Sequence, residues 1–412
     1  SSGRFLQAPA GSCLLLGPRG TGKSTWLRAR WPQALTLDLL DAATQRGLQA
    51  RPERLEALIA GRPEADTVVI DEVQRVPALL DVVHRWIESG PRPLRFVLTG
   101  SSARKLRRGA ANLLAGRLVR AEMHPFMAAE LGAAFDLQRA LREGLVPLVW
   151  SAPDPEAALR SYAALYVREE VQAEALVRDV GGFARFLEAI SFSHGGLLNL
   201  AEVARECEVG RKTVEGYVEV LEDLLLGFRV PVFARRARRQ LVAHDKFYLF
   251  DTGLYRSLRP AGPLDRGEEI GGHALEGLVA QHLRAWAAYR GGLERLHHWR
   301  TRAGSEVDFV VYGPATFAAL EVKRSARVER RDVRALKTFR EDYPEATAAL
   351  LYLGREPLVV DGIPVLPCET FLRDLRPDRA LVPAGLYPNP EPVAAPEDPP
   401  RARRATPKRS SR

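Results

Sequence analysis

The chain has 412 residues, of which 46% are apolar and 27% charged, and these proportions are ordinary for a soluble globular protein of about two to four domains. No apolar run reaches the ~20 residues that cross a bilayer and no basic, apolar leader opens the chain, so we expect a cytoplasmic protein without a membrane partner. The net charge of +9 is compatible with a nucleic-acid partner but does not require one.

Residues 1–123 alternate short apolar runs with helical stretches. The runs Leu14–Leu16, Thr67–Ile70 and Arg95–Thr99 are bounded by Gly, Pro or charged residues and are expected to be buried strands. Strands that alternate with helices indicate a parallel sheet covered by helices, which is the α/β class. Residues 124–184 have a mostly helical pattern and are predicted to form a lid on this core.

A phosphate-binding loop follows the first predicted strand. The run GPRGTGKS fits the pattern G-x-x-x-x-G-K-[ST] and lies between an apolar strand and a helix. Its glycines let backbone N–H groups turn towards phosphate oxygens, and the helix N-terminus adds partial positive charge. We expect Lys23 to reach the β- and γ-phosphates of ATP and Ser24 to ligate Mg²⁺. The predicted nucleotide-binding residues are Gly17, Pro18, Arg19, Gly20, Thr21, Gly22, Lys23, Ser24 and Thr25.

Acidic and polar residues at the ends of the next strands complete this prediction. Asp71 is expected to hold Mg²⁺, mainly through water, and Glu72 to polarise the attacking water. Thr99 or Ser101 would sense the γ-phosphate, although a polar cap at a strand end explains both residues equally well. Arg117 is either an arginine finger that stabilises charge on the transferring phosphoryl group or an ordinary surface arginine.

A winged helix is predicted for residues 185–255, where two helical stretches precede two β-like runs. The second helix begins near Arg211, Lys212 and Thr213, and the N-terminal end of a recognition helix commonly meets DNA. The basic segment at residues 235–239 joins the two β-like runs and would grip phosphates. The alternative is a winged helix that packs two domains together and leaves its arginines in solvent.

Residues 265–376 read as a helix, three strands, a helix and a strand. Glu321 and Lys323 are two apart on one strand of an expected hairpin and share a face, and Asp308 lies across from them. Glu276 belongs to the preceding helix. Two carboxylates on one face can hold Mg²⁺, and a lysine beside the metal can position water for attack on a phosphodiester. The alternative is a solvent-facing pair of charges.

These motifs together resemble the AAA+ ATPases of bacteria and archaea that carry a C-terminal domain of the DUF4143 type. The resemblance spans roughly residues 11–375 and rests on GPRGTGKS, VVIDEVQ, FVLTGSS, AGRL, YLFDTGL, SEVDFVV and LEVKRS. It implies that Arg117 approaches nucleotide. The C-terminal part also resembles the PD-(D/E)xK nuclease fold. That likeness implies that Asp308 and Glu321 are metal ligands, that Lys323 is catalytic and that Glu276 is an accessory acid in the metal site.

The sequence therefore predicts an α/β protein with an AAA+ P-loop core, a helical lid, a winged helix and a restriction-endonuclease-like domain. Residues 377–412, rich in Pro, Ala and Arg, are predicted to be a disordered basic tail. The leading hypothesis is an ATPase that remodels DNA, such as branched duplexes in branch migration, as a homo-oligomer. Whether the C-terminal domain also cleaves DNA with Mg²⁺ stays open. The alternative is a nucleotide-controlled switch that binds a protein partner, with a non-catalytic C-terminal domain.

Overall fold

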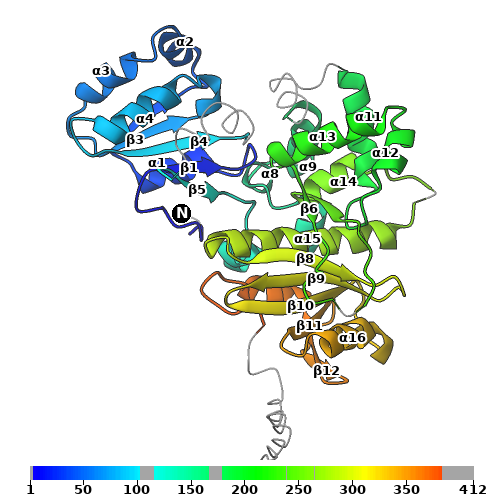
Figure 1. The fold of residues 1–412 in the computed structure, drawn as a ribbon. Coiled ribbons are helices and arrows are strands. Elements are labelled where there is room, and N and C mark those ends of the chain that lie inside the picture. Colours follow the sequence, from blue (N-terminus) through cyan, green and yellow to red (C-terminus); the bar gives the residue numbers. More distant parts are fainter. Residues whose placement is uncertain (1–2, 103–115, 167–178, 238, 264, 383–412) are drawn as a thin grey trace, which may run out of the picture.

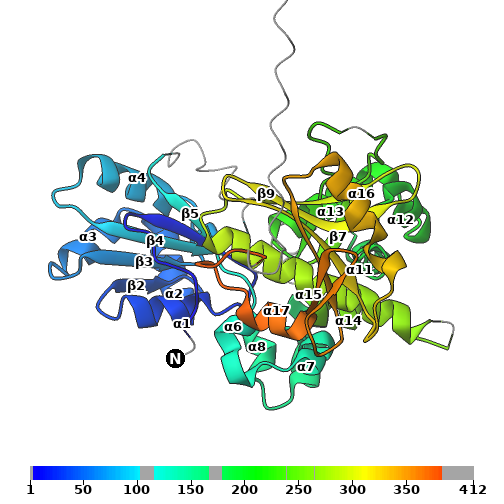
Figure 2. The same cartoon turned by 90° about the horizontal axis from the view of Figure 1, so that it is seen from below.

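The protein is described here by a computed structural model that covers residues 3–102, 116–166, 179–237, 239–263 and 265–382. An N-terminal α/β domain lies to one side, and a helical region and a second sheet lie on either side of the long helix α15 (Figure 1). Seen from below, α15 runs between the helical region and the second sheet and points towards the N-terminal domain (Figure 2).

The N-terminal domain contains a five-stranded parallel sheet, as the alternation of strands and helices predicted. Its strand order is β2-β3-β4-β1-β5, with each neighbouring pair parallel. Strand β3, which lies between β2 and β4, is buried along its whole length, which explains its continuous apolar run. The strands are β1 (Cys13–Leu16), β2 (Leu35–Asp38), β3 (Thr67–Asp71), β4 (Arg95–Gly100) and β5 (Val119–Glu122). The helices are α1 (Lys23–Arg30), α2 (Ala42–Ala50), α3 (Arg54–Ala60) and α4 (Leu79–Ser89), with the short turn η1 (Val73–Arg75).

A run of short helices follows the first sheet. The carboxylates of Asp136, Asp154 and Asp179 accept backbone N–H groups at the starts of α7, α9 and α11, which fixes where these helices begin. The elements are α6 (Ala128–Leu131), η2 (Gly132–Ala134), α7 (Leu137–Glu143), α8 (Pro147–Trp150), α9 (Pro155–Ser161), the π-helical turn η3 (Tyr162–Tyr166) and α11 (Val180–Ser191).

The next elements have the order predicted for residues 185–255. Helices α12 (Leu200–Glu206) and α13 (Arg211–Asp223) precede an antiparallel pair of strands, β6 (Gly227–Val230) and β7 (Lys246–Leu249). One hydrophobic core nevertheless joins α8 and α9 to α11, α12 and α13. The predicted boundary between residues 184 and 185 is therefore misplaced, because it cuts through a single core.

The segment between β6 and β7 does not form a free wing. It runs along the second sheet, where Val232 bridges His298 and Leu241 bridges Thr301. Phe233 is buried in the aromatic core of that sheet. The structure thus favours the packing alternative for this segment over a wing that projects into solvent.

The second sheet has six strands in the order β12-β13-β11-β10-β9-β8. Strands β9 and β10 form the predicted hairpin, and β10, β11 and β13 run parallel to one another. Helix α16 packs in the core on one face, and α15 and α17 pack in the core on the other. The elements are α14 (Thr252–Leu258), α15 (Gly267–Tyr289), β8 (Arg295–Arg300), β9 (Glu306–Gly313), β10 (Thr316–Lys323), η4 (Arg330–Val333), α16 (Arg334–Asp342), β11 (Thr347–Tyr352), β12 (Leu358–Val360), β13 (Ile363–Pro367) and α17 (Cys368–Asp374).

The start of the predicted tail is part of this fold. Leu381 and Val382 are buried in the core beneath α15, and Arg290 donates to the carbonyl of Pro377. The prediction of disorder from residue 377 is therefore wrong for residues 377–382, because apolar contacts and a hydrogen bond hold them. Residues 383–412 lie outside the described part of the chain.

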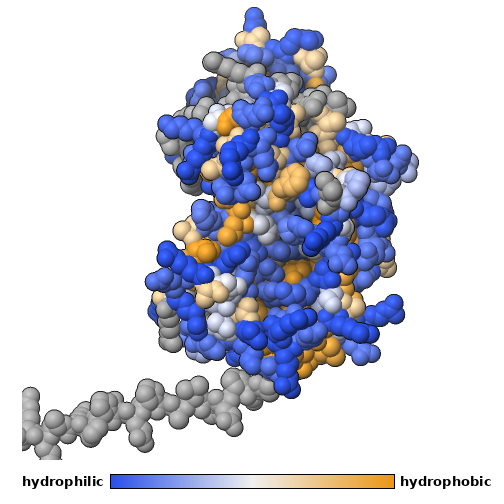
Figure 3. Space-filling model, turned by 90° about the vertical axis from the view of Figure 1, so that its right-hand side faces the viewer, coloured by the Kyte–Doolittle hydropathy of each residue, from blue (hydrophilic) through white to orange (hydrophobic). Residues whose placement is uncertain are grey.

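The face of the molecule that carries the outer helices is predominantly hydrophilic, with scattered apolar side chains (Figure 3). Among the described residues, no helix combines the length and the apolar character needed to span a membrane.

Candidate nucleotide site and the C-terminal carboxylate cluster

The phosphate-binding loop connects the end of β1 to the start of α1. Gly20 has φ +82°, a left-handed conformation, and a Cβ there would lie 3.0 Å from Cβ of Leu148. A Cβ on Gly17 would lie only 2.5 Å from the carbonyl oxygen of Met123. The loop therefore needs glycine at both positions to keep its tight curve against the helical region.

Backbone carbonyls of the loop are held from two sides. Lys23 is buried, and its Nζ donates to the carbonyl of Gly17 at 2.7 Å and to that of Pro18 at 3.3 Å. From the helical region, the backbone N–H of Leu148 donates to Gly20 at 3.1 Å, and the Tyr162 hydroxyl donates to Arg19 at 3.0 Å. These contacts hold the loop in place before any nucleotide binds.

The predicted Mg²⁺ residues meet at the carboxyl end of the first sheet. Ser24 Oγ donates to Asp71 Oδ2 at 2.6 Å, and Thr99 Oγ1 donates to the other oxygen of the same carboxylate. A hydroxyl and a carboxylate side by side are the oxygen donors that Mg²⁺ prefers, so the pair fits this ion. Thr99 also accepts the backbone N–H of Glu72 at 3.0 Å, which ties the ends of β3 and β4 together.

Glu72, the predicted catalytic carboxylate, is positioned by two neighbours. Its backbone has φ 59°, the left-handed region that non-glycine residues seldom adopt. Gln74 donates to Glu72 Oε2, and Ser101 Oγ lies 3.3 Å from the same oxygen. Gln74 also donates to Ser101 at 3.1 Å. The sequence analysis missed Gln74, although it ends the run VVIDEVQ directly after the two acids.

Arg117 lies near the amino ends of the strands of the first sheet, whereas the nucleotide site lies at their carboxyl ends. It precedes β5, which pairs with β1 so that Val119 is level with Cys13, whereas the phosphate-binding loop follows β1. The separation along the strands is on the order of 20 Å. Arg117 forms an ion pair with Glu88 at the end of α4. In this structure Arg117 therefore does not serve the nucleotide site of its own chain.

The C-terminal residues predicted to bind metal do converge. Asp308 of β9 accepts the backbone N–H of Val322 at 2.9 Å, and Lys323 Nζ lies 2.8 Å from Glu321 Oε1. Glu276 reaches the same region from α15. Asp308 and Glu321 are both buried. The hairpin pairing therefore brings the predicted residues to one place.

A lysine that the sequence analysis did not consider lies among these carboxylates. Lys246 of β7 is 2% exposed, and its Nζ is 2.9 Å from Glu276, 2.7 Å from Glu306 and 3.0 Å from Asp308. The Tyr248 hydroxyl also donates to Glu276 at 2.6 Å. Only the fold brings β7 against α15 and β9, so no local pattern marks Lys246.

Burial and mutual repulsion shift the proton affinities in this cluster. Burial, helped by the charge of Asp308, raises the pKa of Glu276 to about 7 and that of Glu321 well above its usual value. Burial lowers the pKa of Lys246, but the carboxylates around it outweigh that effect and hold this pKa well above its usual value. Lys246 therefore carries a full charge inside the protein.

The carboxylate cluster fits a metal less well than the pair of Ser24 and Asp71. Both oxygens of Asp308 are engaged, one by Lys246 and one by a backbone N–H. Glu321 Oε2 is buried without a hydrogen-bond partner, which is the one feature that suits a cation. Across the part of the chain that the structure describes, no group of three or more His, Cys, Asp or Glu side chains is arranged to hold a metal.

The run YLFDTGL at residues 248–254 has a structural role in this fold. Asp251 caps α14 by accepting the backbone N–H groups of Gly253 at 2.9 Å and Leu254 at 3.3 Å. It also accepts the N–H of Leu145 at 2.7 Å, which fixes the turn before α8. Burial raises the pKa of Asp251 to about 6. The carboxylate thus links the helical region that supports the phosphate-binding loop to the core around α15.

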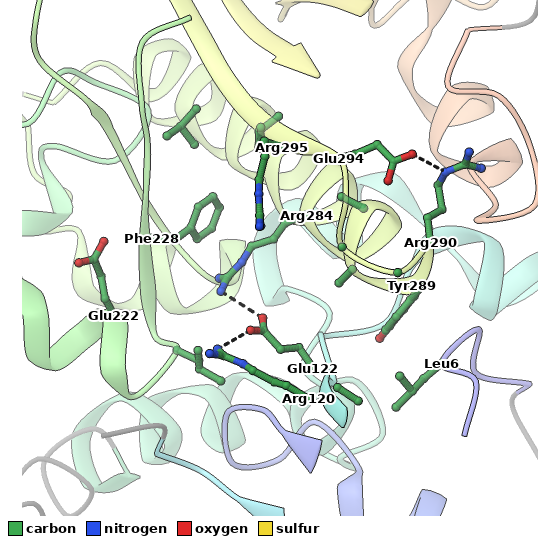
Figure 4. Close-up of a pocket in the computed structure, with 18 of the residues that line it drawn as sticks. Leu6, Arg120, Glu122, Glu222, Phe228, Arg284, Tyr289, Arg290, Glu294 and Arg295 are labelled. Atoms are coloured by element: carbon green, nitrogen blue, oxygen red, sulfur yellow. Dashed lines mark hydrogen bonds and ion pairs between the residues drawn. The ribbon is translucent and has the colours of Figure 1, made fainter. Parts of the chain in front are cut away.

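A cavity of about 1060 Å³ lies between the edge strand β5 and the end of α15, with β6 and β8 as further walls. Arg284 lies 3.6 Å from Glu122 and stacks over Phe228, and Arg120 pairs with Glu122 at 2.6 Å (Figure 4). Arg290 pairs with Glu294 on another wall. The cavity lies between the two sheets, and its lining holds more arginine than glutamate side chains, with Glu122 shared by Arg120 and Arg284.

Three family models match the chain. An AAA domain matches residues 10–132, a domain of unknown function (DUF8612) matches residues 134–265, and DUF4143 matches residues 271–371. The chain thus combines an AAA-type domain with a DUF4143 domain, and the AAA domain suggests ATP binding and ATPase activity. The predicted winged helix and the predicted lid from residue 134 onward fall within the DUF8612 match, which agrees with the single core there, whereas the first residues of the lid belong to the AAA match.

Two curated relatives cover most of the chain. One is an uncharacterized protein of Mycobacterium tuberculosis and the other an uncharacterized protein of Mycobacterium bovis. Each is 27% identical over 369 residues, which is 87% of this chain and 80% of the relative. The likeness therefore extends over the ATPase and the C-terminal domain together.

Proposed function

We propose that this protein hydrolyses ATP with Mg²⁺ at the phosphate-binding loop. The observation that carries the proposal is the hydrogen bond from Ser24 to Asp71 beside the phosphate-binding loop. The lysine of that loop is buried and donates to the carbonyl of Gly17. The ammonium of Lys23 donates to the carbonyls of Gly17 and Pro18 and thus lies along the loop that would hold the phosphate oxygens.

Each residue at this edge has a distinct task in the proposed reaction. Backbone N–H groups of the loop and Lys23 bind the phosphates, and Ser24 and Asp71 would hold Mg²⁺. The ion would supply charge stabilisation to the transferring phosphoryl group. Glu72 orients the attacking water and accepts its proton, and Gln74 keeps the Glu72 carboxylate in place.

Phosphate release from Mg²⁺-ATP tests this proposal. We expect wild-type turnover to require Mg²⁺ and Asp71→Asn to lower it by about 10²-fold, because one charged ligand is lost. Ser89→Ala, which removes an exposed hydroxyl at the end of α4, is a matched control for Ser24→Ala. Turnover by Asp71→Asn at the wild-type rate would contradict the proposal.

We further propose that DNA is the partner on which the ATPase acts, as in the remodelling of branched duplexes. The support comes from the charge pattern of α13, which begins with exposed Arg211 and Lys212 and ends with Glu222 and Asp223. This order opposes the helix dipole, at a cost of about 0.3–1 kcal/mol per charge. Glu222 is explained by its pairing with Arg229, but folding does not explain the basic first turn. An anionic partner does.

ATP turnover with linear, single-stranded and four-way-junction DNA tests this partner. We expect stimulation that falls steeply with salt and is largest with the junction. The double variant Arg211→Gln/Lys212→Gln should lose most of the stimulation but keep the basal rate. Arg330→Gln/Arg331→Gln, which removes two exposed adjacent arginines elsewhere, is the matched control.

A nucleotide-controlled switch with a protein partner is the second candidate. It is favoured by the packing of the segment between β6 and β7, where Arg239 pairs with Glu341 and Asp342 and Arg235 stacks on Tyr312. Those arginines are therefore less available to DNA than the sequence suggested, and Arg238 lies outside the described residues. ATP turnover that no form of DNA changes would support this candidate over the first.

The position of Arg117 supports an oligomer in which it acts on a neighbouring subunit. Its distance from its own nucleotide site leaves a neighbour's site as its only target if it is an arginine finger. Lys23→Ala and Arg117→Ala chains should then each be inactive, and their mixture should regain part of the activity. A mixture as inactive as its components would exclude this arrangement.

A further inference from the structure

The carboxylates of the C-terminal sheet surround a cation that belongs to the chain itself. We propose that the Lys246 ammonium takes the place that a divalent metal would hold among Glu276, Glu306 and Asp308. In this proposal the cluster is a set of buried ion pairs that holds β7 against the C-terminal sheet, and it is not a metal-dependent catalytic centre. The proposal does not depend on the ATPase function.

The number of partners matches the chemistry of an ammonium group. A lysine Nζ has three N–H donors and no acceptor. The three carboxylates around Lys246 lie at 2.9, 2.7 and 3.0 Å. Glu276 and Asp308 accept hydrogen bonds from Nζ, and Glu306 adds an ion pair. The side chain is 2% exposed, so carboxylates and not bulk water surround the ammonium.

The remaining carboxylate oxygens are mostly engaged by other groups. Glu306 Oε2 pairs with Arg300 at 3.0 Å, and Asp308 Oδ2 accepts the backbone N–H of Val322 at 2.9 Å. Glu276 Oε1 takes the Tyr248 hydroxyl as well as Lys246. A metal would therefore have to displace an ion pair or a hydrogen bond for nearly every ligand that it gained.

The spacing also suits an ammonium better than a small divalent ion. Mg²⁺ holds its oxygens at about 2.1 Å in a near-octahedral shell. The carboxylates lie at hydrogen-bonding distances from Nζ, so they would have to contract around the smaller ion. Four carboxylates, including Glu321, already face three cationic side chains, Lys246, Lys323 and Arg300.

The cluster joins parts of the chain that are far apart in sequence. Lys246 precedes Glu276 by 30 residues and Asp308 by 62. Its strand β7 pairs with β6, at the end of the helical region, while its ammonium is held by α15 and β9. A buried charge with three partners at such separations fixes how the helical region sits on the C-terminal sheet.

Two substitutions of Lys246 distinguish the effect of losing its charge from the effect of losing its side-chain volume. Lys246→Ala removes the charge and leaves room for an ion with its waters, whereas Lys246→Met removes the charge but fills the room. We expect both full-length variants to melt on the order of 5–10 °C below wild type, because three carboxylates lose their cation. Mn²⁺ should restore most of that loss in Lys246→Ala and little in Lys246→Met. Lys337→Ala, an exposed lysine paired with Asp361, should behave as wild type.

Isothermal titration with Mn²⁺, without nucleotide, gives the second measurement, and its comparison of wild type with Asp308→Asn needs neither variant of Lys246. We expect wild type and Asp308→Asn to bind Mn²⁺ alike and Lys246→Ala to gain one site that Lys246→Ala/Asp308→Asn lacks. The proposal is overturned if wild type has a Mn²⁺ site that Asp308→Asn removes, or if wild type cleaves DNA with Mg²⁺ or Mn²⁺ and Asp308→Asn does not. It is also overturned if Mn²⁺ stabilises Lys246→Met as much as Lys246→Ala.

Discussion

The nucleotide site and the C-terminal cluster contain the same kinds of residues in opposite electrostatic states. At the phosphate-binding loop, Lys23 donates to the neutral carbonyls of Gly17 and Pro18, and Asp71 accepts neutral hydroxyl donors. In the C-terminal cluster, the Lys246 ammonium is shared by three carboxylates. The first site holds its lysine along backbone carbonyls of the loop that would bind phosphates, whereas the second holds its lysine among carboxylates of its own chain. A lysine and acids near strand ends are therefore not enough to identify a reactive centre.

The largest expected effect comes from removing the lysine of the first site. Lys23→Ala should lower ATP turnover by about 10³-fold, because the phosphates lose their one buried ammonium. The measurement is phosphate release at saturating Mg²⁺-ATP, with Lys337→Ala as a lysine control outside the site. If Lys23→Ala bound and split ATP as well as its parent, the two sites would not differ as we describe.

Glu72→Gln should have the next largest effect. The amide keeps the shape of the side chain but cannot accept a proton, so turnover should fall by about 10²-fold while ATP binding stays near wild type. Turnover and equilibrium binding of a fluorescent ATP analogue, measured on the same preparation, separate the two steps. A parallel loss of binding would assign Glu72 to nucleotide binding and not to catalysis.

The C-terminal cluster has four carboxylates and three cations, so we expect one carboxylate to hold a proton and the stability of the protein to depend on pH. Because the pKa of Glu276 is raised to about 7, the folded protein holds a proton that the unfolded chain has already released above about pH 4.5. The stability due to this proton is complete below about pH 4.5 and is lost as the pH rises through 7. Glu276→Gln should therefore gain on the order of 2–3 kcal/mol relative to wild type between these limits.

Urea unfolding at pH 5 and pH 7.5 measures this difference. The exposed substitution Glu345→Gln is the control and should leave the pH dependence of wild type unchanged. Equal pH dependence of Glu276→Gln and wild type would show that Glu276 is ionised in the folded protein at neutral pH.

The smallest expected effect concerns the hydroxyl that supports the cluster. Tyr248→Phe removes the donor that lies 2.6 Å from Glu276 and should lower the free energy of unfolding by about 1–2 kcal/mol. ATP turnover should not change, because the nucleotide site is built from other elements. Tyr255→Phe is a suitable comparison, because the ring of Tyr255 stacks on His194, which also contacts the ring of Tyr248. A larger loss of unfolding free energy for Tyr255→Phe than for Tyr248→Phe would show that the Tyr248 hydroxyl has no special role at the cluster.

Much of the fold and of the nucleotide site was predictable because the sequence patterns that specify them lie within short segments of the chain. The loop of residues 17–24 and the two acids after β3 are each encoded within one local run, and the parallel order of the strands brings their carboxyl ends to one edge. The hairpin that pairs Asp308 with the strand of Glu321 is likewise local, since only a short turn separates β9 from β10. Neighbouring residues leave a pattern that sequence periodicity can reveal.

By itself, then, the sequence determined the α/β core, the phosphate-binding loop, the order of the elements from α15 to β11, and the convergence of the C-terminal acids. Only the tertiary structure decided that Lys246 is inserted among those acids, that the segment after β6 packs along β8, and that Arg117 lies far from its own nucleotide site. The physical reason is chain separation. Contacts between residues that are tens of positions apart depend on how whole elements pack, and no local periodicity records which side chain will meet which charge.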